Sequence, residues 1–201
     1  MDGNKLVKEQ GRRWSLKLKN RNEIGQLLNE LNLTGAGIEI GVAHGNFADI
    51  WIPTCNLEKV YLLDPWQEEI YNEYIDDKRG SQSEQERWYN LVIEKMNKFG
   101  DRVEIIRGDS REEFKQFSDN YFDFIYIDAN HQYEAVKTDL ANWYPKCKVG
   151  GVFAGHDYMD GYRWKAKFGV KRAVTEFCKE INATVSTTGE RRGTSWYLIK
   201  K

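Results

Sequence analysis

The sequence predicts an α/β fold in which a mostly parallel sheet carries helices on both faces. Short apolar strands alternate along the chain with segments whose apolar residues recur at helical spacing. The run 121–128 is apolar at nearly every position, as expected of a strand buried on both faces. The last two predicted strands, near 183–187 and 195–200, have a short connection, so they form a hairpin and one must run antiparallel.

The predicted elements follow one another in a regular order within one domain over 1–201. Residues 1–20 form a polar, basic arm, and helical periodicity begins in the segment 22–33. Two polar stretches with aromatic residues, 67–83 and 159–168, are predicted to be loops at the active site. The remaining strands are predicted at 38–42, 60–66, 103–109 and 152–155, and the remaining helices at 84–98, 110–117, 132–143 and from Val170 to Phe177.

The composition and charge of the chain exclude several classes of protein. The 201 residues are 40% hydrophobic and 30% charged, which is typical of a soluble globular domain. The net charge of −1 and the absence of a basic block argue against an obligatory nucleic-acid partner. The sequence has neither a signal-peptide pattern nor an apolar run long enough for a bilayer, and its three cysteines lack metal-like spacing. We therefore expect a cytoplasmic protein without a membrane partner, and the sequence leaves the oligomeric state open.

The segment 37–47 has the pattern of a ligand cradle. A short strand runs into a turn with two glycines, and Asn46 begins the next helix. Glycine lets a backbone approach a ligand closely, and a helix N-terminus offers free N–H groups. Glu39 is placed to hold a cationic or hydroxyl-bearing ligand. The alternative is a turn that only links strand to helix.

Every predicted strand of the parallel part ends near an acidic residue. In sheets of this kind ligands bind at the carboxyl ends of the strands, so these acids are expected to meet at one site. They are Glu39, Asp64, Asp109, Asp128 and Asp157.

The acids after the second and third strands have the spacing of a nucleoside site. Asp64 lies 19 residues beyond Gly45, close to the spacing at which an acid binds ribose hydroxyls in nucleotide-binding folds. Trp66 is placed to stack on an adenine or to form a wall of the pocket. Asp109, beside Ser110, is placed to accept a hydrogen bond from an adenine amino group.

A dinucleotide fits the glycine turn poorly. The glycines are Gly41 and Gly45, and the position where a pyrophosphate needs a second glycine is Ala43. The His44 side chain also crowds that approach. The turn therefore suits a nucleoside with an amino-acid tail, and an NAD-dependent oxidoreductase is the less favoured alternative.

Several of these motifs together resemble class I S-adenosylmethionine-dependent methyltransferases. The resemblance covers about residues 35–180, and its most specific piece, 126–134, together with 150–158, is similar to a bacterial subgroup near the macrolide and cephalosporin O-methyltransferases. It implies a Rossmann-like, doubly wound sheet of seven strands with the last antiparallel. The motifs are Glu39–Gly45, Asp64-Pro65-Trp66, Gly108-Asp109-Ser110, 126–134 and 150–158.

The resemblance implies S-adenosylmethionine as cofactor and S-adenosylhomocysteine as product. It places Gly41 and Gly45 at the methionine part, Asp64 at the ribose and Asp109 on the adenine side. The full set predicted to contact the cofactor is Glu39, Gly41, His44, Gly45, Asn46, Asp64, Trp66, Asp109, Ser110 and Asp128.

The expected reaction is methyl transfer to a small molecule, with a hydroxyl oxygen as acceptor. A non-catalytic nucleoside-binding or scaffold domain that kept the cradle is the alternative from another class. Aromatic residues in or next to the two loops are expected to form the walls of the acceptor site; they are Tyr71, Tyr74, Tyr158, Tyr162 and Trp164.

The predicted catalytic residues are Asp128, His131, His156 and Asp157. His131 has the chemistry of a general base, although it could instead cap the 132–143 helix or line the cofactor pocket. Related O-methyltransferases hold a divalent metal with an acid after the fourth strand and an acidic pair after the fifth. Here His156 replaces one acid, which puts a magnesium site in doubt because Mg²⁺ prefers oxygen ligands. The sequence therefore favours a metal-free base mechanism, and no metal ligand is assigned.

Overall fold

A seven-stranded sheet forms the centre of the computed structural model, which describes residues 18–72, 80–163, 166–191 and 193–201. The strand order is β3-β2-β1-β4-β5-β9-β8; the first five strands are parallel, and β9 runs antiparallel to both of its neighbours, β5 and β8. This confirms the predicted fold class, including the antiparallel C-terminal hairpin. The strands are β1 (Ala36–Ile40), β2 (Lys59–Asp64), β3 (Val103–Arg107), β4 (Phe122–Ile127), β5 (Cys147–Gly155), β8 (Ser186–Thr187) and β9 (Trp196–Ile199).

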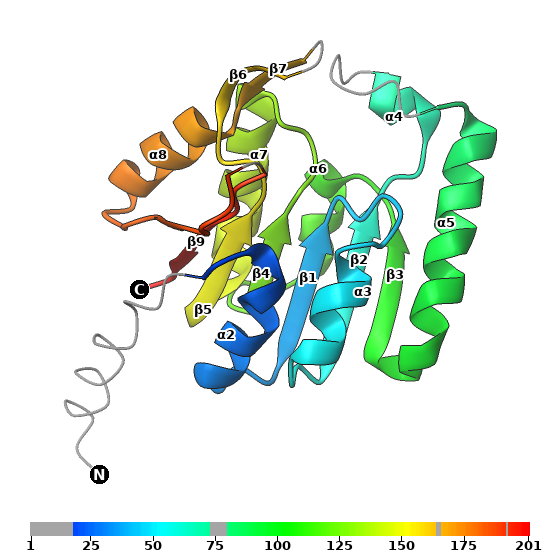
Figure 1. Cartoon of the computed structure of the whole chain (residues 1–201), viewed down its shortest axis with the longest axis horizontal. Helices are drawn as coiled ribbons and strands as arrows, with labels where there is room; N and C mark the ends of the chain where they lie inside the picture. The colour runs from blue at the N-terminus through cyan, green and yellow to red at the C-terminus, as the bar shows by residue number, and fades with distance from the viewer. Residues whose placement is uncertain (1–17, 73–79, 164–165, 192) are drawn as a thin grey trace.

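Helices cover both faces of the sheet (Figure 1). One apolar core joins α2, α3 and α5 to one face, and a second core joins α7 and α8 to the other. In the part of the chain that the structure describes, no helix is both long and apolar enough to cross a membrane. The α-helices are α2 (Ile24–Glu30), α3 (Ala48–Trp51), α4 (Glu68–Asn72), α5 (Gln82–Met96), α6 (Ser110–Glu113), α7 (Tyr133–Trp143) and α8 (Val170–Glu180). The 3₁₀ turns are η1 (Arg21–Glu23), η2 (Ile52–Thr54), η3 (Asn97–Arg102), η4 (Phe114–Gln116) and η5 (Tyr144–Lys146).

Local sequence explains the main elements. The apolar face of α2 buries Ile24, Leu27 and Leu28, as its periodicity predicted. The helix α5 starts at a capping box in which Ser81 and Glu84 satisfy each other's backbone N–H groups. All six residues of β4 are buried, which fits its position in the middle of the sheet.

The two predicted active-site loops contain regular structure. The stretch 159–168 holds most of an antiparallel hairpin, β6 (Asp160–Arg163) paired with β7 (Ala166–Gly169), so the prediction of a loop was wrong there. Most of its described positions are exposed, and only Phe168 and Gly169 among them are buried, so the two strands lack the apolar pattern that reveals a core strand. The stretch 67–83 holds α4 and the start of α5. Tyr74, Trp164, the Tyr71 side chain and most of the arm 1–20 lie outside the described residues.

The parallel strands end at one edge of the sheet, the upper edge in Figure 1. Backbone hydrogen bonds tie each strand end to its neighbour. Gly41 N donates to Leu63 O at 2.8 Å, Asp128 N to Ile40 O at 2.8 Å, and His156 N to Ile127 O at 3.0 Å. This edge therefore carries the residues that the sequence singled out.

Candidate functional site

The glycine turn after β1 is held in place by Asp64. Ala43 lies in the left-handed region at φ 48°, and its N–H donates to Asp64 Oδ2 at 2.8 Å. Trp66, at φ 41°, donates its backbone N–H to Asp64 Oδ1 at 3.0 Å and its indole N–H to Ala43 O at 2.9 Å. Asp64 is 1% exposed. Its carboxylate thus fixes the shape of the turn, and its ribose contact stays a prediction.

Gly41 and Gly45 are both pressed against protein atoms. A Cβ on Gly41, which has φ 90°, would lie 2.2 Å from the carbonyl oxygen of Asp128. A Cβ on Gly45, at φ 69°, would lie 3.2 Å from the Val92 side chain on α5. Packing within the chain therefore explains why both positions are glycine. Their contact with the methionine part of a cofactor stays a prediction.

His44 and Asn46 are held against α5. The His44 ring lies 4.2 Å from the Trp88 ring, centroid to centroid. Lys95 donates from Nζ to His44 O at 2.9 Å and to Asn46 Oδ1 at 2.6 Å. Sequence reasoning missed Lys95, because nothing in the local sequence of α5 shows that this half-buried lysine reaches the turn.

Glu39 faces the core. Its carboxylate is 2% exposed and accepts a hydrogen bond from the indole N–H of Trp51 at 2.7 Å. Burial raises the pKa of Glu39 to about 8. The side chain therefore joins β1 to α3, which is a different place from the ligand-facing position expected from the sequence.

Asp109 and Ser110 lie at the start of α6. Asp109 is the N-cap and accepts from Arg111 N at 2.8 Å; burial works to raise the pKa of Asp109, but Arg111 outweighs it and the pKa is lowered. Ser110 Oγ donates to Asp139 Oδ1 at 2.7 Å, and burial raises the pKa of Asp139 to about 7.

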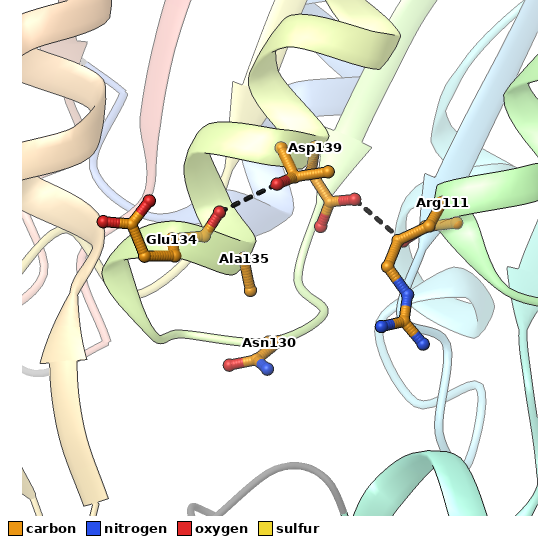
Figure 2. Close-up of a pocket in the computed structure, with 7 residues that line it drawn as sticks. Arg111, Asn130, Glu134, Ala135 and Asp139 are labelled. Atoms are coloured by element: carbon orange, nitrogen blue, oxygen red, sulfur yellow. Dashed lines mark hydrogen bonds between the residues drawn. The ribbon is translucent and has the colours of Figure 1, made fainter.

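A cavity of about 270 Å³ opens beside these residues. Figure 2 shows Arg111 on one side of it, Asn130 below, and Glu134 and Asp139 on α7. Its lining combines hydroxyl, amide and carboxyl groups, which suits a polar ligand edge such as that of a purine.

The four predicted catalytic residues converge in one cluster. His131 Nε2 lies 3.4 Å from Asp128 Oδ1 and 3.4 Å from Asp157 Oδ2. His156 Nδ1 lies 3.6 Å and 3.5 Å from the same two oxygens. Two carboxylates and two imidazoles from the ends of β4 and β5 thus share one small volume.

Two arginines that the sequence did not single out complete the cluster. Arg21 Nη1 lies 3.2 Å from Asp128 Oδ2, and Arg163 Nη1 lies 2.6 Å from Asp157 Oδ1. Arg21 comes from η1 and Arg163 from β6, so only the tertiary fold brings them to the carboxylates.

Opposite charges set the protonation states of the cluster. Burial works to raise the pKa of Asp128, but His156, His131 and Arg21 hold it well below its usual range. The pKa of Asp157 is also lowered, because both histidines outweigh the effect of burial. Burial alone would lower the pKa of His156, but Asp128 and Asp157 raise it above its ordinary value.

His131 is fixed by the hairpin. Its ring stacks on Phe168 with centroids 4.5 Å apart, and its carbonyl accepts from Gly169 N at 2.9 Å. The N-cap of α7 is Gln132, so His131 does not cap that helix. Its Nε2 is buried, has no hydrogen-bond partner among the described residues, and faces the two carboxylates.

The donor atoms also fit a cation. One ligand atom each from Asp128, His131 and Asp157 lies within 4.8 Å of the other two. The unsatisfied imidazole nitrogen and the two carboxylate oxygens are donors that suit Mn²⁺, Fe²⁺ or Zn²⁺ better than Mg²⁺.

A cavity of about 580 Å³ lies next to the cluster. Asp157 belongs to the cluster and also lines the cavity. Gly193, another lining residue, lies against His156, because a Cβ on Gly193 would lie 3.0 Å from Cε1 of His156. The cavity is lined by Asp157, Tyr158, Met159, Arg163, Arg191, Gly193 and Thr194.

The chain is similar in fold to several solved methyltransferases. A Staphylococcus aureus protein described as a caffeoyl-CoA O-methyltransferase is 17% identical, with a TM-score of 0.62 over 99% of this chain and 93% of that one. The N-methyltransferase NodS of Bradyrhizobium japonicum is 15% identical, with a TM-score of 0.60 over 89% and 94%. A SAM-dependent methyltransferase of Aquifex aeolicus is 17% identical, with a TM-score of 0.54 over 100% of both chains. No curated protein matches the sequence.

A comparison of the sequence with protein-family models identifies the family of this chain. A model of the methyltransferase domain matches residues 38–158, which run from β1 to the cluster after β5. That span includes the glycine turn, the acids at the strand ends and all four members of the cluster. The sheet order with its antiparallel β9 agrees with the class I fold, and neither observation favours an NAD-dependent oxidoreductase. The chain therefore belongs to the methyltransferase domain family and is a class I enzyme that uses S-adenosylmethionine.

Proposed function

We propose that this chain methylates a hydroxyl oxygen of a small molecule, with His156 as the base that takes the hydroxyl proton. The observation that carries this proposal is the position of the His156 ring. Its Nδ1 edge faces the carboxylates of Asp128 and Asp157. Its Cε1–Nε2 edge borders Gly193, which lines the cavity of about 580 Å³. The imidazole therefore connects the cavity to two negative charges.

A base in this position favours an oxygen acceptor. A hydroxyl becomes a good nucleophile only as it loses its proton, whereas a neutral amine already has a free electron pair. The two carboxylates stabilise the imidazolium that forms when His156 takes the proton. The cavity volume lies within the range of small-molecule sites, and the net charge of −1 gives no support to a nucleic-acid acceptor.

The same edge offers groups that fit the cofactor. Bound S-adenosylmethionine supplies the electrophilic methyl group. Its positively charged sulfonium and amino groups suit an edge that carries ionised carboxylates such as Asp128. We assign the adenine end to Ser110 and Asn130 and the methionine end to the turn from Gly41 to Asn46, and we place the ribose beside Asp64 and Trp66.

Binding a divalent cation is a second role for the cluster, supported by the Nε2 of His131, which has no hydrogen-bond partner among the described residues. Asp128, His131 and Asp157 would hold it, and it would act as a Lewis acid on the acceptor oxygen. Arg21 and Arg163 each occupy one carboxylate oxygen from outside, so they orient Asp128 and Asp157 toward the centre of the cluster.

The test is formation of S-adenosylhomocysteine from S-adenosylmethionine with a panel of phenols and alcohols. His156→Ala should lower kcat by about 10²–10⁴-fold, the usual contribution of a general base. Its affinity for S-adenosylhomocysteine, measured by calorimetry, should stay close to that of the wild type. Unchanged turnover in His156→Ala would remove the base assignment, and turnover with amines alone would move the acceptor from oxygen to nitrogen.

A further inference from the structure

The cavity beside His156 carries positive charge that the proposed reaction does not use. Three segments form its walls: the end of β5, the strand β6, and the loop between β8 and β9. Arg163 and Arg191 are its cationic residues, and Asp157 is its one acid among the lining residues.

The two arginines differ in what they contact. Arg163 is held by Asp157, whose carboxylate also faces both histidines. Arg191 is exposed, and within the described residues it has no ion pair. The neighbouring acid, Glu190, is engaged elsewhere, because it accepts from Thr188 Oγ1 at 2.5 Å and from Arg21 N at 3.2 Å. The guanidinium of Arg191 is therefore available to an incoming anion.

The loop that carries Arg191 is anchored on both sides. Gly189 N donates to Leu18 O at 2.8 Å, and Thr194 Oγ1 donates to Glu190 O at 2.9 Å. Thr188 and Ser195 are also hydrogen-bonded, with Thr188 N donating to Ser195 O at 2.9 Å. These bonds anchor the loop, from which Arg191 and Gly193 both line the cavity, and Gly193 lies against the His156 ring.

The cavity also has an apolar part. Tyr158 and Met159 line it and pack against the core under α8. A ligand that fills this space has an apolar body and an oxyanion at the arginine end, because guanidinium groups pair with carboxylate and phosphate through two parallel hydrogen bonds.

We propose that the methyl acceptor carries a carboxylate or phosphate group, and that Arg191 binds this oxyanion while the acceptor hydroxyl faces His156. The inference rests on the proposed function, since it names the substrate class of that site. Arg191 is then a specificity-determining residue, and Arg163 adds positive potential while it positions Asp157.

The experiment compares matched charged and neutral probes on the protein loaded with S-adenosylhomocysteine. Benzoate is compared with benzamide, and phenyl phosphate with phenol, by calorimetry. The wild type should bind at least one anion of these pairs about tenfold or more tightly than its neutral partner, as expected for a charge-assisted hydrogen bond. The pair that shows the preference tells carboxylate from phosphate.

Three variants assign the effect to Arg191. Arg191→Gln should abolish the preference for the anion, and Arg191→Lys should retain part of it because the charge remains. Arg87→Gln, an exposed arginine on α5, is the matched control and should bind like the wild type. A preference that survives in Arg191→Gln, equal affinity for anion and neutral partner, or no binding of either anion at millimolar concentration would overturn the inference. Loss of S-adenosylhomocysteine binding itself would instead count against the proposed function.

Discussion

At the scale of single residues, the site is built from residues with a strained backbone conformation and from a buried carboxylate. Ala43 and Trp66 both lie at positive φ, a region that residues with a Cβ adopt at a cost. The carboxylate of Asp64 accepts a hydrogen bond from the backbone N–H of each of these two residues. A carboxylate in this position offsets the strain of both residues, so Asp64 contributes to the shape of the turn before any ligand is bound.

The first prediction at this scale concerns Asp64→Ala. Two backbone N–H groups, one buried and one partly buried, would lose their acceptor, so the free energy of unfolding should fall by about 2–6 kcal/mol, at roughly 1–3 kcal/mol for each group. Urea denaturation measures it, and Asp101→Ala on an exposed residue is the control. Full stability combined with lost S-adenosylhomocysteine affinity would show that Asp64 serves the ribose and not the turn.

At the scale of elements, the cluster depends on where β4 and β5 end. Asp128 follows β4, while His156 and Asp157 follow β5, and these strands pair in parallel register with Ile127 opposite Gly155. The hairpin β6–β7 then supplies Phe168 beneath His131 and Arg163 beside Asp157. Strands, loops and hairpin together orient the donors inward.

The second prediction concerns metal at this cluster. If a cation is held, turnover should fall in EDTA and return with Mn²⁺, and Asp157→Ala should lose both the recovery and Mn²⁺ binding measured by electron paramagnetic resonance. Asp119→Ala is the control, because Asp119 is an exposed acid that precedes β4, at the opposite end of that strand from Asp128, and pairs with Lys146. Turnover that is indifferent to EDTA, with no Mn²⁺ signal, would support the metal-free base mechanism that the sequence favoured.

The sheet and the cluster could be predicted from the sequence because both leave local patterns in it. A strand buried on both faces is continuously apolar, and chemistry at the ends of parallel strands gathers at one edge. The hairpin β6–β7 left no such signal, since its residues are mostly exposed. Arg21 could not be found either, because it meets Asp128 across 107 positions of sequence. The inward direction of Glu39 depends on Trp51, which only the packing of α3 on β1 reveals.

At the scale of the whole molecule, two buried carboxyl groups work against stability at high pH. Burial raises the pKa of Glu39 to about 8 and that of Asp139 to about 7, on opposite faces of the sheet. In the unfolded chain these groups release their protons near pH 4. Folding therefore takes up protons between those limits, so their contribution to stability is full at low pH and is lost as the pH rises through the folded-state values.

The last prediction isolates Glu39. Glu39→Gln keeps an acceptor for Trp51 but has no proton to release, so the variant should lose much of the wild type's decline in unfolding free energy between pH 5 and 8, of order 4 kcal/mol for a single group shifted this far. Urea denaturation at several pH values measures the two curves, which should converge at low pH and diverge toward pH 8. Asp128 and Asp157, whose pKa values are lowered, act in the opposite sense only below about pH 4 and leave this window clear. Glu94→Gln on the exposed face of α5 should follow the wild type. Parallel curves for Glu39→Gln and wild type would mean that Glu39 is ionised in the folded protein.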